Sequence, residues 1–384
     1  MRFPKFSGEW KETTLGKIAE ITKGSGISKD QLSEQGAPCI LYGELYTKYK
    51  SEIINEVYSR TELDSSPLVK SKANDIIIPC SGETAIDIST ARCILFNNIL
   101  LGGDLNIIRL KYDDGGFFAY QLNGARKKDI ARVAQGVSVV HLYGENLKQI
   151  KVYYPNIEEQ RKITHLLSLI DERIATQNKI IEKYESLIKG LNNILLYGTG
   201  GKSVCLGDIL LERSERSRTN NQHEVLSSTV KGIFSQREYF SKDIASENNV
   251  GYKIIRLHDV VLSPQNLWMG NINYNDRFEI GIVSPSYKVF SIADGYDNQF
   301  VAAMLKTHRA LYSYMMVSEQ GASIVRRNLN MEAFSQLVFK IPSLDKQREI
   351  GCAISLLKSQ LKTANKLIRA YTSQKQYLLR QMFI

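Results

Sequence analysis

One stretch of about 40 residues occurs twice in this chain, and each copy carries apolar side chains at alternating intervals of four and three positions. The first copy runs from Asn156 to about Tyr197 and the second from Ser343 to Ile384. This spacing is the a/d seam of a coiled coil, and it is narrower than the stripe of a helix that lies on a globular core. The chain must therefore contain two long paired helices, and the simplest partner for each is its own duplicate.

Adding 187 to each seam position of the first copy gives a seam position of the second. The only plainly polar members are Gln177 in the first copy and Lys375 in the second. The seam positions are Ile163, Leu167, Ile170, Ile174, Gln177, Ile181, Tyr184, Ile188, Leu191 and Leu195, followed by Ile350, Ile354, Leu357, Leu361, Ala364, Ile368, Tyr371, Lys375, Leu378 and Met382.

The two helices begin with similar signals. Asn156 follows Pro155 and precedes Glu159, which predicts an Asn N-cap with a Glu three residues later. Ser343 follows Pro342 and precedes an acid in the first turn. Glycines at 198, 200 and 201 predict the end of the first helix. Each helix of about 40 residues would be about 60 Å long at about 1.5 Å per residue.

The segments before the two helices also repeat. They share a Leu-Gly-x-Ile start, a strand that opens with Asp, a Gln-Gly-x-Ser loop and a Pro that leads into Gln-Arg-x-Ile. We expect a mixed α/β fold, because short β-branched runs alternate with turns and a helix is predicted over 117–134. The predicted parts are a first domain (1–155), a long helix with a hinge (156–201), a second domain (202–342) and a second long helix (343–384).

The loops of the two segments differ where the framework repeats. Polar and aromatic side chains crowd beside glycine at 42–50, 80–84 and 135–138, and a different set occurs at 263–268 and 320–327. Such side chains can contact phosphates and base edges, although the alternative for each one is an ordinary solvated turn. The candidate DNA-binding residues are Lys23, Tyr42, Glu44, Tyr46, Thr47, Lys48, Ser81, Glu83, Thr84, Gln135, Ser138, Gln265, Asn266, Trp268, Gln320, Ser323, Arg326 and Arg327.

The net charge of +10 fits a polyanionic partner, but it is unevenly placed. Basic minus acidic residues give 20 − 18 = +2 over 1–155 and 6 − 6 = 0 over 156–201. They give 16 − 14 = +2 over 202–342 and 8 − 2 = +6 over 343–384. The charge therefore points to nucleic acid less strongly than a basic patch on one domain would.

Motifs for catalysis or metal binding are missing. Gly201-Lys202-Ser203 resembles the end of a P-loop, but Leu196 stands where its first glycine belongs and a helix precedes it instead of a strand. The histidines and the five cysteines lack metal-ligand spacing, and the cysteines are expected as free thiols in a reducing cytoplasm. No apolar run is long enough to span a membrane. These absences favour a binding protein, with no cofactor or metal of its own.

The order of these parts resembles the specificity (S) subunit of type I restriction–modification systems. The matching residues are Trp10 with the Leu15-Gly16-x-Ile18 start, the Gln-Gly-x-Ser loop and Glu159-Gln160-Arg161 at the helix start, and the order of these parts then recurs. The second half departs by one residue, because Lys346 stands where the first half has Glu159. The resemblance covers nearly the whole chain.

The resemblance implies a non-catalytic subunit in which each globular domain reads one half of a bipartite, asymmetric DNA site. It implies that the long helices pair antiparallel as a spacer and dock two DNA adenine methyltransferase subunits, which carry S-adenosylmethionine. Two restriction subunits that use ATP and Mg²⁺ would join them. A spacer of about 60 Å would hold the centres of the half-sites at most about 17 base pairs apart, at about 3.4 Å per base pair.

Two other readings stay open. The chain could be a coiled-coil adaptor that bridges protein partners without reading DNA, or, less in keeping with the missing motifs, a stand-alone nucleic-acid enzyme. Separately, an antiparallel pair would bring Gln177 close to Ala364, and we hypothesise that this polar position disfavours wrong partners. A Gln177→Leu variant that self-associates no more than the wild type would count against that hypothesis.

Overall fold

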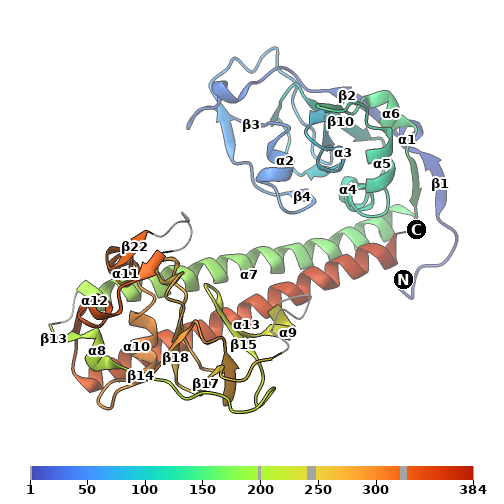
Figure 1. Ribbon diagram of the computed structural model, residues 1–384. Coiled ribbons are helices and arrows are strands. Elements are labelled where there is room, and N and C mark those ends of the chain that lie inside the picture. The colour runs from blue at the N-terminus through green and yellow to red at the C-terminus, as the bar shows by residue number, and fades with distance from the viewer. Residues whose placement is uncertain (1, 198–199, 240–247, 321–326, 384) are drawn as a thin grey trace. The chain divides into compact units, whose positions relative to one another are not determined.

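The computed structural model describes residues 2–197, 200–239, 248–320 and 327–383 (Figure 1). The chain divides into two compact units, and both long helices contribute to each. The first unit comprises Met1–Lys179 and Lys366–Ile384, and the second comprises Ile180–Asn365. The boundaries between these units fall inside the two long helices, whereas each long helix is a separate segment in the prediction. The four predicted segment boundaries therefore stay a prediction.

The globular part of the first unit is built around a five-stranded sheet in the order β2-β10-β6-β8-β4. A three-stranded sheet (β5-β3-β9) and the pairs β1-β12 and β7-β11 complete it. The strands are β1 Lys11–Thr14, β2 Ala19–Lys23, β3 Ala37–Ile40, β4 Ile53–Ile54, β5 Ser59–Thr61, β6 Ile76–Pro79, β7 Ser81–Gly82, β8 Arg92–Ile94, β9 Leu100–Leu101, β10 Leu105–Leu110, β11 Val140–His141 and β12 Lys151–Tyr154. The helices are α1 Leu15–Ile18, α2 Glu44–Thr47, α3 Ala85–Ile88, α4 Gly115–Asn123, α5 Lys127–Val133 and α6 Gly144–Lys148, with the 3₁₀ turn η1 Lys29–Gln31.

The second unit follows the same plan, with a four-stranded sheet in the order β14-β21-β18-β19. The two-stranded pairs are β13-β24, β15-β16, β17-β20 and β22-β23. The strands are β13 Lys202–Cys205, β14 Leu210–Arg213, β15 Leu226–Thr229, β16 Gly232–Ser235, β17 Lys253–Arg256, β18 Val260–Leu262, β19 Ile272–Tyr274, β20 Ile280–Val283, β21 Lys288–Ile292, β22 Ser318–Gln320, β23 Arg327–Leu329 and β24 Val338–Ile341. The helices are α8 Leu206–Ile209, α9 Gln236–Tyr239, α10 Asn298–Met304, α11 His308–Met316 and α12 Met331–Ser335, with the 3₁₀ turn η2 Leu267–Met269.

The predicted mixed α/β fold with an internal repeat is confirmed, but the single helix predicted over 117–134 is wrong. It is two helices, α4 and α5, because Gly124 interrupts the chain after α4. Asp114 caps the start of α4 by accepting a hydrogen bond from the amide of Phe117. Glycine has low helix propensity and no side chain to pack, so the turn falls there.

The long helices are α7 (Ile157–Tyr197) and α13 (Leu344–Met382), and they run antiparallel within each unit. In the first unit Asp171 pairs with Lys375, whereas Gln177, later in α7, lines a small cavity with Tyr371, earlier in α13. In the second unit Leu361 lines a cavity with residues 185–193 of α7. The seam positions whose side chains are described are all buried or half-buried, which confirms the predicted coiled coil.

Helices α7 and α13 begin directly after Asn156 and Ser343, as predicted, but the contact predicted for Glu159 differs. The amide of Glu159 donates to Asn156 Oδ1 at 3.0 Å, as an Asn N-cap requires. The Glu159 carboxylate does not reach back to the cap and instead accepts two hydrogen bonds from the Arg2 guanidinium. Gln177 and Ala364 are both buried, but they lie in different units, so their proposed proximity stays a prediction.

The repeated glutamine at the start of each long helix explains part of the repeated sequence. Gln160 Oε1 accepts from the amide of Asp114 at 2.9 Å, and its Nε2 donates to the carbonyl of Pro155. Gln347 makes the same two bonds, to the amide of Asp297 and the carbonyl of Pro342. Each glutamine thus fixes the corner between a strand, a long helix and the first turn of α4 or α10.

A second repeated device is an aspartate that holds a turn beside the main sheet. Asp75 accepts two hydrogen bonds from the Arg109 guanidinium and one from the backbone amide of Lys72. Asp259 pairs in the same way with Arg213 and the amide of Arg256. The predicted correspondence between the Asp75 and Asp259 strands therefore rests on shared contacts as well as on sequence.

A Gln347→Leu substitution is expected to lower the free energy of unfolding of the second unit by about 1–3 kcal/mol, because it leaves two buried backbone groups without partners. Urea denaturation, with hydrogen exchange at the α10 amides, measures the effect. Arg348→Leu is the matched control, because Arg348 is exposed and forms only a surface ion pair with Asp345. Equal losses in the two variants would show that the corner does not depend on Gln347.

Candidate nucleic-acid interface

The Gln-Gly-x-Ser loop of the first unit closes a hairpin that lies beside the turn after β6. Gln135 and His141 exchange backbone hydrogen bonds of 2.8 and 2.7 Å. His141 is in register with Ser81, and Val140 with Gly82. Gly136 has φ +117°, and a Cβ there would lie 2.1 Å from the carbonyl oxygen of Val139, so only glycine fits this turn. The long-range pairing of β7 with β11 therefore joins two of the predicted loops.

The third predicted loop of this unit contributes Tyr46 to the same place. A Cβ added at Gly82 would lie 3.9 Å from the Tyr46 hydroxyl. Burial raises the pKa of Tyr46, and the nearby Tyr42, Asp87 and Glu83 raise it further. The three loops are thus neighbours on one part of the unit.

Two aromatic residues that the sequence analysis did not select extend this surface. His141 and Tyr143 stack with ring centroids 6.2 Å apart, and Lys23 Nζ lies 6.0 Å from the centre of the Tyr143 ring. Tyr143 is 45% exposed. The signal that could have found them is their position directly after the Gln-Gly-x-Ser loop. At the tip of that loop Val137 is 97% exposed, beside the exposed Ser138.

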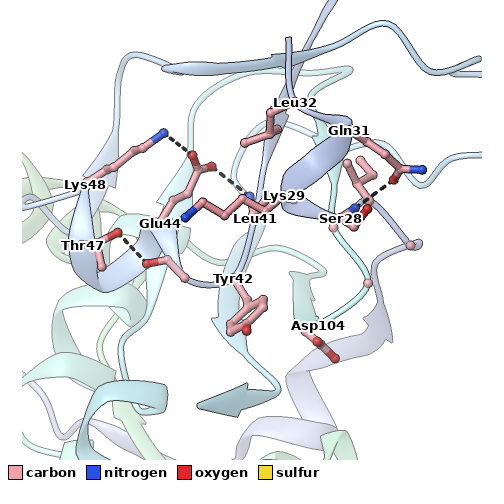
Figure 2. Close-up of a pocket in the computed structure, with 15 residues that line it drawn as sticks. Ser28, Lys29, Gln31, Leu32, Leu41, Tyr42, Glu44, Thr47, Lys48 and Asp104 are labelled. Carbon is pink, nitrogen blue, oxygen red and sulfur yellow. Dashed lines mark hydrogen bonds and ion pairs between the residues drawn. The ribbon is translucent and has the colours of Figure 1, made fainter. Parts of the chain in front are cut away.

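A cavity of about 1020 Å³ opens between α2, η1 and the loop after β9 (Figure 2). Tyr42, Thr47 and Lys48 line it together with Lys29 and Asp104. Figure 2 shows that these side chains come from separate segments of the chain. Lysine, tyrosine and carboxylate groups around one space can bind a polar, partly aromatic ligand.

Several predicted readers are engaged in bonds within the chain. Glu44 is 6% exposed, and its carboxylate accepts from Lys48 Nζ at 2.6 Å, from the Leu41 amide at 2.9 Å and from Ser59 Oγ. Thr47 Oγ1 donates to the Gly43 carbonyl, and Thr84 caps α3 through Asp87. These atoms hold the loops in shape, so a direct contact of Glu44, Thr47 or Thr84 with DNA stays a prediction.

The second unit gathers its own candidates around Trp268. The Arg327 guanidinium carbon lies 5.0 Å from the centre of the Trp268 ring, a cation–π arrangement. The Arg327 amide donates to the Gln265 carbonyl at 3.1 Å, and Arg327 is in register with Gln320. Two buried atoms, Asn266 Oδ1 and Arg327 Nε, have no hydrogen-bond partner among the residues that the structure describes.

In both units the strand after the Gln-Gly loop thus bonds to the turn that follows a strand of the main sheet: the Leu142 amide donates to the Cys80 carbonyl, and the Arg327 amide to the Gln265 carbonyl. In the first unit Ser81 pairs with the hairpin and Tyr46 lies beside Gly82, whereas in the second unit Arg327 of the hairpin contacts Gln265 and Trp268. Ser323 and Arg326 lie outside the described residues, and the side chain of Gln320 is not described.

Residues 7–186 match the family model "Type I restriction modification DNA specificity domain". This match spans the first globular domain, its hairpin and much of α7. The first half of this chain is therefore a type I restriction–modification specificity domain. The curated "Type I restriction enzyme MjaVIII specificity subunit" of Methanocaldococcus jannaschii is 23% identical over 203 residues. That alignment covers 50% of this chain and 46% of the relative, so it spans about half the length of each.

Solved structures show that the whole chain has the fold of a specificity subunit. The S subunit of a type I restriction–modification system from M. genitalium has a TM-score of 0.66 at 16% identity, over 100% of this chain and 99% of that one. A chain from a study of the assembly and conformational transition of the type I R-M system has a TM-score of 0.50 at 13% identity, over 98% of both chains.

The described residues do not meet the requirements of a metal site, a disulfide or a membrane span. No group of three His, Cys, Asp or Glu side chains there could hold a metal ion. All five cysteines are free. No described helix is long and apolar enough to cross a membrane.

Proposed function

We propose that this specificity subunit reads a bipartite, asymmetric DNA site, one half with each globular domain. The observation that carries the proposal is the repeated hydrogen bond between the strand after the Gln-Gly loop and a turn of the main sheet, because that turn bears unlike side chains in the two domains. A scaffold that is repeated within the chain, with two different polar and aromatic surfaces, fits two different half-sites. Exposed lysine, tyrosine, serine and glutamine side chains are of the kind that contacts phosphates and base edges.

In the first domain we assign base contacts to the exposed hairpin tip and to its aromatic neighbours. Val137 offers an apolar contact of the type that recognises a thymine methyl group, and Ser138 beside it offers a hydrogen bond. Tyr143, Tyr46 and Lys23 would hold the duplex at the edge of this surface through its backbone. Glu44 and Thr84 would support the loops from behind.

In the second domain we assign the central role to Arg327. Its guanidinium lies on the Trp268 ring, and Arg327 Nε and Asn266 Oδ1, which have no hydrogen-bond partner among the described residues, are suited to a hydrogen-bonding ligand. A bidentate contact from arginine to guanine O6 and N7 is the commonest specific contact in the major groove. Gln265, whose carbonyl accepts from the Arg327 amide, belongs to the same proposed surface, and DNA contacts by Gln320, Ser323 and Arg326 stay a prediction.

We further propose that the long helices dock two DNA adenine methyltransferase subunits, and through them two restriction subunits. Apolar side chains exposed on α7 and α13 supply contact area for such partners: Leu169, Ile180, Leu187, Leu356, Leu367 and Tyr377. Catalysis would belong to the partners, with S-adenosylmethionine on the methyltransferase subunits and ATP and Mg²⁺ on the restriction subunits. The complex would work in the cytoplasm, where the host DNA is.

Exchanging residues 1–155 for the corresponding domain of another specificity subunit is expected to change one half of the methylated motif and to leave the other half unchanged. The measurement is a genome-wide map of methylated adenine after co-expression with the methyltransferase subunit. The reciprocal exchange of residues 202–342 is the control and should change only the other half. A motif with both halves unchanged by either exchange would contradict the proposal.

The adaptor alternative predicts a different outcome in a simpler assay. A complex that reads DNA should retain its target over a scrambled duplex, and the retention should fall steeply as salt rises, because phosphate contacts release counterions. An adaptor complex should show no preference between the two duplexes at any salt concentration.

A further inference from the structure

A partly buried ion network joins the first globular domain to both long helices. Lys375 Nζ, from the seam of α13, lies 2.5 Å from Glu52 Oε2 and 2.5 Å from Asp171 Oδ1 of α7. Asp171 Oδ2 accepts hydrogen bonds from the Tyr120 hydroxyl at 2.8 Å and from Ser51 Oγ at 3.0 Å. The side chains of the three charged residues are at most 12% exposed, so their charges are only weakly screened by solvent.

The repeat places different residues at the matching positions of the second unit. Because the two long helices are related by 187 residues, Asp171 corresponds to Lys358 (171 + 187) and Lys375 corresponds to Ile188 (375 − 187). The acid of α7 is thus matched by a base in α13, and the base of α13 is matched by an apolar residue in α7. The two helices therefore share the spacing of their seam, but they carry opposite charges at the matching positions Asp171 and Lys358.

In the second unit a further lysine, Lys306, lies near Lys358, the residue that matches Asp171. Burial, and to a lesser extent the neighbouring charge of Lys358, lower the pKa of Lys306 to about 8. Lys306 Nζ bonds only to uncharged oxygens, of Asn273 at 2.5 Å and of the Val230 backbone. Neither lysine forms an ion pair within the described ranges, although the charge of Asp276 partly offsets the lowered pKa of Lys358. A further lysine here would meet two cations.

We propose that Glu52, Asp171 and Lys375 form a recognition site by which α13 selects α7 and the first domain of its own chain, and rejects the helices of a second copy. If two copies paired α13 with α13 in the same antiparallel register, Lys375 of each would face Lys358 of the other, beside Lys306. If they paired α7 with α7, Asp171 of each would face Ile188 of the other. Only the pairing of α7 with α13 places Asp171 opposite Lys375. Pairing of α13 with α13 is disfavoured by repulsion between Lys375 and Lys358, and pairing of α7 with α7 is disfavoured because Asp171 has no cation opposite it.

The first test neutralises the network while preserving its shape. A full-length chain with Glu52→Gln, Asp171→Asn and Lys375→Met keeps a hydrogen-bond acceptor for the Tyr120 and Ser51 hydroxyls, but the three network side chains no longer carry charge. Two differently tagged copies are co-expressed and one tag is used for capture. Capture of the second tag is expected to rise by about tenfold or more over the wild type, which corresponds to about 1.4 kcal/mol. The matched control, Glu56→Gln with Glu172→Gln and Arg369→Met, makes the same charge changes at exposed positions and should behave like the wild type.

The second test leaves the network intact, so a folding defect at the network cannot confuse it. Lys358→Asp places an acid where α13 of a second copy would present Lys375, and it should make the chain form concentration-dependent dimers in analytical ultracentrifugation. Lys362→Asp, exposed one turn further along α13, is the control. The proposal is overturned if Lys358→Asp dimerises no more than this control, or if the folded neutral variant still excludes a second copy. Neither readout involves DNA, so the result does not depend on the proposed half-site reading.

Discussion

Replacing Lys375 with methionine is expected to lower the free energy of unfolding of the first unit by about 3–5 kcal/mol, the range seen when one partner of a buried ion pair is removed. The substitution keeps the length of the side chain, so most of its packing in the seam survives. What it removes is the cation between Glu52 and Asp171, whose carboxylates are 9% and 7% exposed. Two buried carboxylates would then lose the cation that bridges them, and the charge of Arg92, whose guanidinium bonds to the Leu45 and Tyr49 carbonyls, would remain near both.

Urea denaturation of the full-length chain, followed by hydrogen exchange along the first half of α7, measures this loss. The neutral triple variant serves as the control, because it removes the remaining charges along with the lysine. It should recover most of the lost stability, since replacing a whole buried network costs far less than breaking one member. Equal destabilisation of the single and triple variants would mean that packing by the Lys375 chain, and not its charge, holds this junction.

Replacing Arg327 with alanine should weaken binding of the target by about 1–3 kcal/mol, or roughly 5- to 150-fold, when the specificity subunit is in complex with its methyltransferase partner. The expected loss follows from the guanidinium that lies on the Trp268 ring and from its Nε, for which the described part of the chain supplies no hydrogen-bond partner. The methylated motif should become degenerate at one position of one half-site, and the other half should stay intact.

Binding to the cognate duplex and to single-base variants at fixed salt, together with the adenine methylation map, tests this prediction. Lys231→Ala, at an exposed turn of the same unit, is the control for a general loss of positive charge. Thermal unfolding of both variants shows whether the loss of the Trp268 contact disturbs the fold. A uniform loss across all duplexes would place Arg327 on a phosphate and remove its role in reading bases.

The long helices could be predicted from sequence because their signals are local and periodic. The seam and the Asn156 cap each depend on residues close together in the chain, and the 187-residue repeat shows the same local signals a second time, so the structure agrees with them. The break at Gly124 was missed because apolar residues on both sides of it fit one helical period.

The candidate site could be predicted only in part, because its assembly depends on long-range pairing. Nothing local in the sequence indicates that β7 would pair with β11 and so bring Ser81 beside His141. Glu44 resembled an exposed reader in the sequence, yet it is buried by Lys48 and Ser59, which the fold brings to it. Composition identifies residues that can contact DNA, whereas burial decides which of them are free to do so.

The glutamine corners at Gln160 and Gln347 have a practical consequence for protein engineering. Two of their hydrogen bonds go to main-chain atoms, the amides of Asp114 and Asp297 and the carbonyls of Pro155 and Pro342. A main-chain partner is present whatever side chains the neighbouring loops carry. A foreign globular domain should therefore fit onto α7 or α13 without redesign of this corner, provided that it ends in proline and has a capping aspartate at the helix that matches α4 or α10. Domains with different DNA targets could then be combined in new pairs.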